Sequence, residues 1–129
     1  ISFEGNTGPY ILYTIVRIKS ILGKYEAQNP GTTAETILPA ASDAEKTLML
    51  ELSKYNDVME NAFAETAPHK ICQYIFDLSN AFNSFYHDTR ILAEEDKARQ
   101  ASWIALITLV KRVLEACIQV LGFEAPERM

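Results

Sequence analysis

Glycine and proline are scarce in this sequence, with five of each among 129 residues. Because both residues interrupt helices and form turns, their scarcity leaves long uninterrupted stretches and disfavours a sheet protein with many turns. Apolar residues make up 48% of the chain and charged residues 22%, as in ordinary soluble globular proteins. The length therefore predicts one domain with a hydrophobic core of its own.

Cysteines and long hydrophobic runs are also few. Cys72 and Cys117 lie in segments with helical periodicity, so we expect buried thiols in a reducing cytoplasm rather than a disulfide framework. No apolar run approaches the ~18 residues of a membrane span. No basic segment precedes an apolar one at the N-terminus, as a secretion signal requires. Since Ile1 is not an initiator, we expect the chain to be part of a longer protein.

An excess of basic charge is missing as well, because the net charge is -5. Nucleic-acid binders usually carry a basic surface, so the total argues against such a function. The distribution weakens this objection. Residues 9–25 contain Arg17, Lys19 and Lys24 without any acid, whereas acidic residues gather in 35–65. A local basic face therefore remains compatible with the sequence.

Apolar residues recur every three or four positions and predict an all-α bundle of about five helices. A loop at 1–8 leads into a domain at 9–129. The expected helices cover about 10–25, 42–54, 57–63, 66–87 and 97–121. Ser42 and Glu45 form a capping-box pattern at one helix start, and Thr66 is expected to cap another. Gly122 is expected to end the last helix, with Pro126 preventing a restart.

The sequence contains no recognisable catalytic or metal-binding motif. Glycine-rich phosphate loops, nucleophile elbows and calcium loops are absent. His69 and Cys72 have the spacing to share a metal, but no third ligand stands at a recognisable distance. His87 could act as an acid or base, but no recognisable motif places a nucleophile or a carboxylate beside it. We therefore expect no catalytic residue, metal or cofactor in this chain.

The first predicted helix carries two phenols and two cations along one face: Tyr10, Tyr13, Arg17 and Lys24. Unstacked RNA bases bind to flat aromatic or guanidinium surfaces, and phosphates bind to cations, so this face suits RNA. The alternative is that the tyrosine rings belong to the core and the cations are only solvated. From these residues alone we favour the alternative.

Three segments nevertheless resemble one family in its own order: EGNTGPYILYTIVRIKSIL at 4–22, AFNSFYHDTRIL at 81–92 and VLGFEAPERM at 120–129. They are similar to the DALR-type anticodon-binding domain of arginyl-tRNA synthetases. This resemblance implies an all-helical domain that receives the anticodon loop. It also implies that a separate catalytic domain, absent here, attaches arginine to tRNA with ATP and Mg²⁺.

The resemblance also implies which residues contact RNA. Carried over by position, they are Tyr10, Tyr13, Arg17, Tyr86, Arg90 and Met129 with its terminal carboxylate. The aromatic and basic face of the first helix contains three of them, which favours its functional interpretation. Leu12 replaces a usual glutamine and Trp103 stands near a usual arginine, so neither receives a role.

The expected function is therefore recognition of arginine tRNA. Arginine codons all have G in the middle, so every cognate anticodon has C there, and one cytosine pocket would serve them all. Arg17 is the expected donor to this base, and the Met129 carboxylate the expected acceptor. The expected partners are the tRNA and the catalytic domain of the same chain, without membrane or DNA, in a monomer. The alternative is an acidic helical module that binds another protein.

Overall fold

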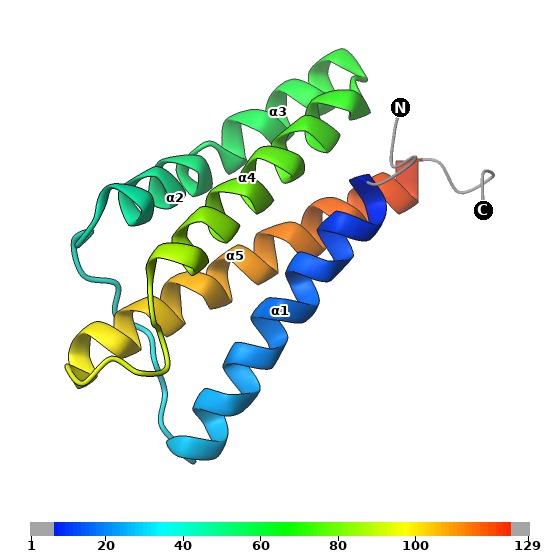
Figure 1. The fold of residues 1–129 in the computed structure, drawn as a ribbon. Helices are drawn as coiled ribbons and strands as arrows, with labels where there is room; N and C mark the ends of the chain where they lie inside the picture. The colour runs from blue at the N-terminus through cyan, green and yellow to red at the C-terminus, as the bar shows by residue number, and fades with distance from the viewer. Residues whose placement is uncertain (1–6, 125–129) are drawn as a thin grey trace.

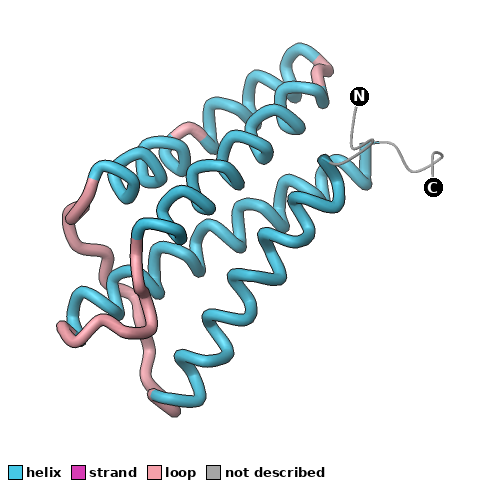
Figure 2. The backbone as a smooth tube through the Cα atoms, in the orientation of Figure 1, coloured by secondary structure: helices cyan, strands magenta, loops and turns pink. Residues whose placement is uncertain are grey.

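The computed structural model describes residues 7–124, and these form five helices (Figure 1). The helices are α1 (Thr7–Gln28), α2 (Asp43–Ser53), α3 (Tyr55–Glu65), α4 (Pro68–Asp88) and α5 (Lys97–Glu124). The described part of the chain contains no strand, which confirms the predicted all-α class. Figure 2 shows that two longer loops, after α1 and after α4, lie at the same end of the bundle.

Helix α4 is the centre of the packing and contacts each of the other four helices. In Figure 1, α2 and α3 follow each other along one side of α4, while α5 and α1 lie on its other side. The helices α1 and α4 run in one direction, and α5 runs against both. This arrangement brings the middle of α1 next to the C-terminal end of α4.

The core follows the predicted apolar faces. All five positions expected to face the core in α4 are buried: Ile71, Ile75, Leu78, Phe82 and Phe85. Helix α5 is buried on most sides along its middle, as its wide apolar surface predicted. On α1 the core side chains come from one face and leave the opposite face accessible, which matters for the site below.

Two predicted helix boundaries are wrong. Thr66 does not begin α4 but ends α3, in a left-handed conformation with φ of 52°. The backbone N–H of Ala67 donates to the carbonyl of Ala62 at 2.9 Å, so this turn closes α3 tightly before Pro68 begins α4. Gly122 does not end α5, which continues to Glu124. A glycine costs a helix about 1 kcal/mol relative to alanine, too little by itself to stop so long a helix.

Helix α1 begins at Thr7 instead of about residue 10, so the end of the expected loop at 1–8 is helical and Pro9 lies in the first turn. Proline is tolerated there because the first-turn N–H groups of a helix have no partner inside the helix. None of the helices described in residues 7–124 is long and apolar enough to cross a membrane.

The loop after α1 is fixed by a buried carboxylate. Ser42 accepts from the N–H of Glu45 at 3.1 Å and so caps α2 as predicted. Glu45 is fully buried, and its Oε1 accepts from the N–H of Ala41 at 2.8 Å and from Nε1 of Trp103 at 3.2 Å. The N–H of Leu38 also donates to the Ser102 hydroxyl at 2.8 Å. Ser102 therefore links this loop to α5 directly, and Trp103 links it through Glu45 at the start of α2.

Candidate nucleic-acid interface

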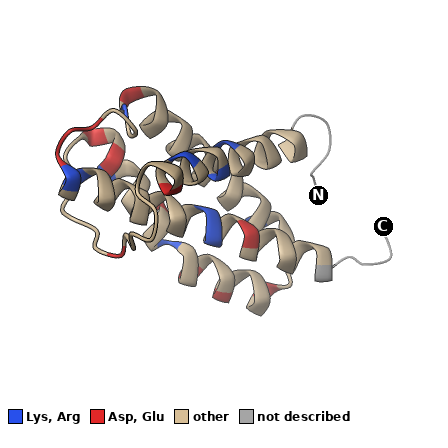
Figure 3. Ribbon diagram, turned by 90° about the horizontal axis from the view of Figure 1, so that it is seen from below, with Lys and Arg blue, Asp and Glu red and all other residues tan. Residues whose placement is uncertain are grey.

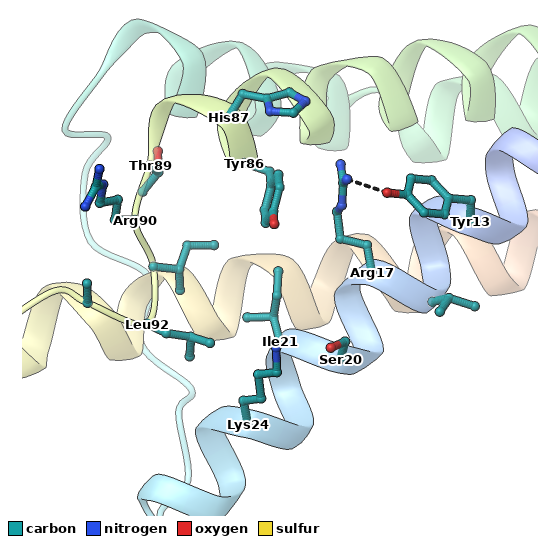
Figure 4. A pocket seen from close by; sticks show the side chains of 13 residues that line it. Tyr13, Arg17, Ser20, Ile21, Lys24, Tyr86, His87, Thr89, Arg90 and Leu92 are labelled. Atoms are coloured by element: carbon teal, nitrogen blue, oxygen red, sulfur yellow. Dashed lines mark hydrogen bonds between the residues drawn. The ribbon is translucent and has the colours of Figure 1, made fainter.

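A cleft of about 620 Å³ lies between the outer face of α1 and the segment that follows α4 (Figure 4). Two tyrosine rings, several cations and a few aliphatic side chains line it. The lining residues are Tyr13, Val16, Arg17, Ser20, Ile21, Lys24, Tyr86, His87, Thr89, Arg90, Ile91, Leu92 and Ala93. The cleft therefore unites the first-helix face with the FYHDTR segment, two regions far apart in the sequence.

Arg17 occupies the mouth of this cleft between two aromatic rings. Its Cζ lies 4.2 Å from the centroid of the Tyr86 ring and 4.8 Å from that of Tyr13. Its Nη2 donates to the Tyr13 hydroxyl at 2.5 Å, and its Nη1 donates to Oδ1 of Asn83 at 2.7 Å. A guanidinium has five N–H groups, so these two bonds leave three for a ligand.

Helical spacing on α1 explains the placement of Tyr13 and Arg17. The two residues are four apart and therefore lie above each other on one face. The core positions of α1, such as Ile11, Ile15 and Ile18, lie on another face and are almost fully buried. Tyr13 keeps 53% of its surface exposed and Val16 keeps 60%, so the helix presents flat and apolar surface to solvent here.

The other side of the cleft depends on how α4 ends. Tyr86 stacks on the buried ring of Phe82, with centroids 6.1 Å apart and an interplanar angle of 29°. After α4, the carbonyl of Ile91 accepts from Nε2 of Gln100 at 3.0 Å, and the Ile91 side chain is buried. This anchor holds the loop against α5 and leaves its neighbour Arg90 exposed at the rim.

The cleft is positively charged although the protein is acidic. In the view of Figure 3, basic and acidic residues are interspersed over the bundle. The charged residues among those that line the cleft are Arg17, Lys24 and Arg90, and none of its lining residues is a carboxylate. His87 adds a further nitrogen donor at the same edge. A local cationic surface thus exists despite the net charge of -5.

The structure brings four of the six predicted contact residues to this cleft: Tyr13, Arg17, Tyr86 and Arg90. Tyr10 lies outside it. Its ring packs against Phe76 with centroids 5.9 Å apart, and its hydroxyl donates to Oδ1 of Asn80 at 2.6 Å. Met129, with its carboxylate, lies outside the described residues, as does Pro126.

Sequence reasoning missed Asn83, which accepts from Nη1 of Arg17 and is 9% exposed. The sequence did contain an indication of its role. Asn83 is an amide side chain between Phe82 and Phe85, two positions that the apolar pattern assigns to the core. Lys24 belonged to the predicted helix face but was not assigned to the site, and it lines the cleft.

Comparison with known proteins decides the family. Residues 11–129 match the model of the DALR anticodon binding domain. The chain belongs to this family. It is 60% identical over 130 residues to an arginine–tRNA ligase of Agathobacter rectalis and 53% identical over 128 residues to one of Alkaliphilus oremlandii. Each alignment covers 99% of this chain but only 22% of the relative. The resemblance inferred from the three sequence segments is thereby confirmed.

A solved structure agrees with the DALR assignment. The arginyl-tRNA synthetase of Thermus thermophilus superposes with a TM-score of 0.76 at 31% sequence identity. The match covers 94% of this chain and 21% of that one. This DALR domain thus corresponds to about a fifth of the length of its relatives.

Proposed function

We propose that this domain binds the anticodon loop of arginine tRNA in the cleft between α1 and the end of α4. The observation that carries the proposal is the placement of the Arg17 guanidinium between the Tyr13 and Tyr86 rings. Stacking on a flat surface holds an unpaired base with about 1–3 kcal/mol and without base preference. The other two cations of the cleft, Lys24 and Arg90, would contact the phosphates on either side of that base.

Base preference comes from directed hydrogen bonds. Cytosine presents acceptors at O2 and N3 and a donor at its amino group, whereas uracil presents a carbonyl in place of the amino group. The free N–H groups of Arg17 suit O2 and N3. The terminal carboxylate of Met129 is the proposed acceptor for the amino group. Together they would select the middle cytosine shared by all arginine anticodons.

The domain would thereby select tRNA for a reaction performed elsewhere. We assign ATP-dependent attachment of arginine, with the Mg²⁺ that ATP carries, to a catalytic domain outside these 129 residues. This DALR domain would contribute binding energy and specificity, without donating a group to the reaction. Its partners would be tRNA and that catalytic domain.

The test is binding of the 129-residue protein to an anticodon stem-loop with an arginine anticodon, followed by fluorescence anisotropy. We expect affinity to fall several-fold between 50 and 200 mM salt, as about two phosphate contacts require. We also expect a middle C→U change to weaken binding by about tenfold or more, the cost of unpaired polar groups at a selective site. Absence of binding, or equal affinity for both RNAs, would contradict the proposal and favour the protein-binding alternative.

A further inference from the structure

Asn83 is buried next to Arg17 and joins α4 to α1 through its amide. Its Nδ2 lies 3.0 Å from the Thr14 hydroxyl, 3.1 Å from the Tyr10 hydroxyl and 3.0 Å from the Ser79 carbonyl. Its Oδ1 accepts from Nη1 of Arg17 at 2.7 Å. One buried side chain therefore contacts the backbone of its own helix and three side chains of α1.

Only one orientation of this amide satisfies its neighbours. The Ser79 carbonyl can only accept a hydrogen bond, and the Arg17 guanidinium can only donate one. Turning the amide over would set two acceptors against each other at Ser79 and two donors against each other at Arg17. Thr14 and Tyr10 reinforce this choice, because each hydroxyl hydrogen already points elsewhere, to the Tyr10 carbonyl and to Asn80.

We propose that Asn83 is a positioning residue that holds the guanidinium of Arg17 in one orientation before any ligand arrives. The amide accepts from Nη1, while the Tyr13 hydroxyl accepts from Nη2. A long arginine side chain loses much rotamer freedom when it binds a ligand, and a side chain held in advance loses less. For its effect on RNA, the inference rests on the proposed function.

Tyr10 gains a role in the same network. It lies outside the cleft, but its hydroxyl accepts a hydrogen bond from the Asn83 amide, which in turn accepts one from Arg17. Tyr10 would therefore influence the cleft through Asn83 rather than by touching RNA.

The first experiment needs no RNA. Side-chain nitrogen resonances of Arg17, assigned by their loss in Arg17→Ala, report whether its guanidinium rotates freely. We expect separate, slowly exchanging Nη signals in the wild type. They should merge in Asn83→Ala, and remain separate in Asn83→Asp, where a carboxylate oxygen still accepts from Arg17. Gln73→Ala is the matched control on the same helix, since it removes an exposed amide that donates to Asp77 and lies outside the network of Arg17, Asn83 and Tyr10.

The second experiment is a double-mutant cycle with the anticodon stem-loop. Asn83→Ala should weaken binding about tenfold, the value of one hydrogen bond to a charged group. The same substitution should have almost no further effect in Arg17→Ala, because Asn83 acts through Arg17. Thermal unfolding of each variant shows whether the bundle remains folded at the binding temperature.

The outcomes separate this inference from the proposed function. Separate Nη signals in Asn83→Ala, or merged signals in the wild type, would overturn the positioning role whatever the RNA result. Equal losses of affinity with and without Arg17 would show that Asn83 acts on the fold alone and would also overturn it. If the wild type binds no RNA, the proposed function fails, and the resonances alone decide whether Asn83 holds Arg17.

Discussion

The guanidinium of Arg17 covers the ring of Tyr86, with Cζ 4.2 Å from the ring centroid. The two residues come from different helices, α1 and α4, so their contact depends on the packing of the bundle. Cation and ring form one stacked unit, and a base that enters the cleft meets a flat, charged surface already in place.

Arg17→Ala should weaken binding of the anticodon stem-loop by about tenfold to a hundredfold, because a charged donor and a stacking surface are both lost. Arg17→Lys should recover little, since an ammonium keeps the charge but cannot stack or donate in a planar fork. Lys19→Ala is the matched control. It removes the same charge from an exposed position of α1 outside the cleft. Equal losses for Arg17→Ala and Lys19→Ala would reduce the role of Arg17 to net charge.

Tyr13→Phe should weaken RNA binding less than Tyr13→Ala. Phenylalanine keeps the ring beside Arg17 and loses only the hydroxyl that accepts from Nη2, whereas alanine loses both. Since Tyr13 is 53% exposed, neither change should lower the unfolding midpoint much. Dissociation constants of the three proteins for one stem-loop give the order. If the two variants bind equally weakly, the hydroxyl matters and the ring does not.

Trp103→Phe should destabilise the fold by about 1–3 kcal/mol, because Glu45 then loses a donor inside the core. In a Glu45→Gln background Trp103→Phe should lower the free energy of unfolding by less. A buried neutral amide that loses one hydrogen-bond donor is destabilised less than a buried carboxylate that loses it. Urea unfolding of the wild type, both single variants and the double variant measures this coupling. Additive losses would mean that Trp103 stabilises only through packing.

Burial raises the pKa of the Cys117 thiol from 9.0 to about 12. Above pH 9 the unfolded chain has released this proton and the folded protein still holds it, so stability falls as pH rises. The fall should approach about 1.4 kcal/mol per pH unit for a thiol so deeply buried. Cys117→Ala should lower the free energy of unfolding at all pH values. Between pH 9 and 11, however, the free energy of unfolding should fall less with pH in this variant than in the wild type. An unchanged decline would show that other groups, such as the buried phenol of Tyr74, cause it.

The helices and the α1 side of the cleft were predictable from local periodicity, whereas Tyr86 and Arg90 on the other side were assigned only through the family resemblance. Apolar residues between Ile71 and Phe85 recur at helical spacing, and Tyr13 and Arg17 lie on one helix face because they are four residues apart. Asn83 was not found, because its role depends on which residues of α1 lie opposite it across the helix packing. Thr66 and Gly122 were misjudged, since residue type alone does not fix the backbone conformation at a helix end.

The most direct test of the proposed RNA-binding cleft is photocrosslinking with a stem-loop that carries 5-iodocytidine at the middle anticodon position. This base crosslinks to aromatic side chains on which it stacks, and mass spectrometry locates the modified peptide. We predict crosslinks at Tyr13 or Tyr86, suppressed by excess unmodified stem-loop and reduced in Arg17→Ala. Specific crosslinks confined to α2 and α3, on the other side of α4, would contradict a binding site between α1 and the end of α4.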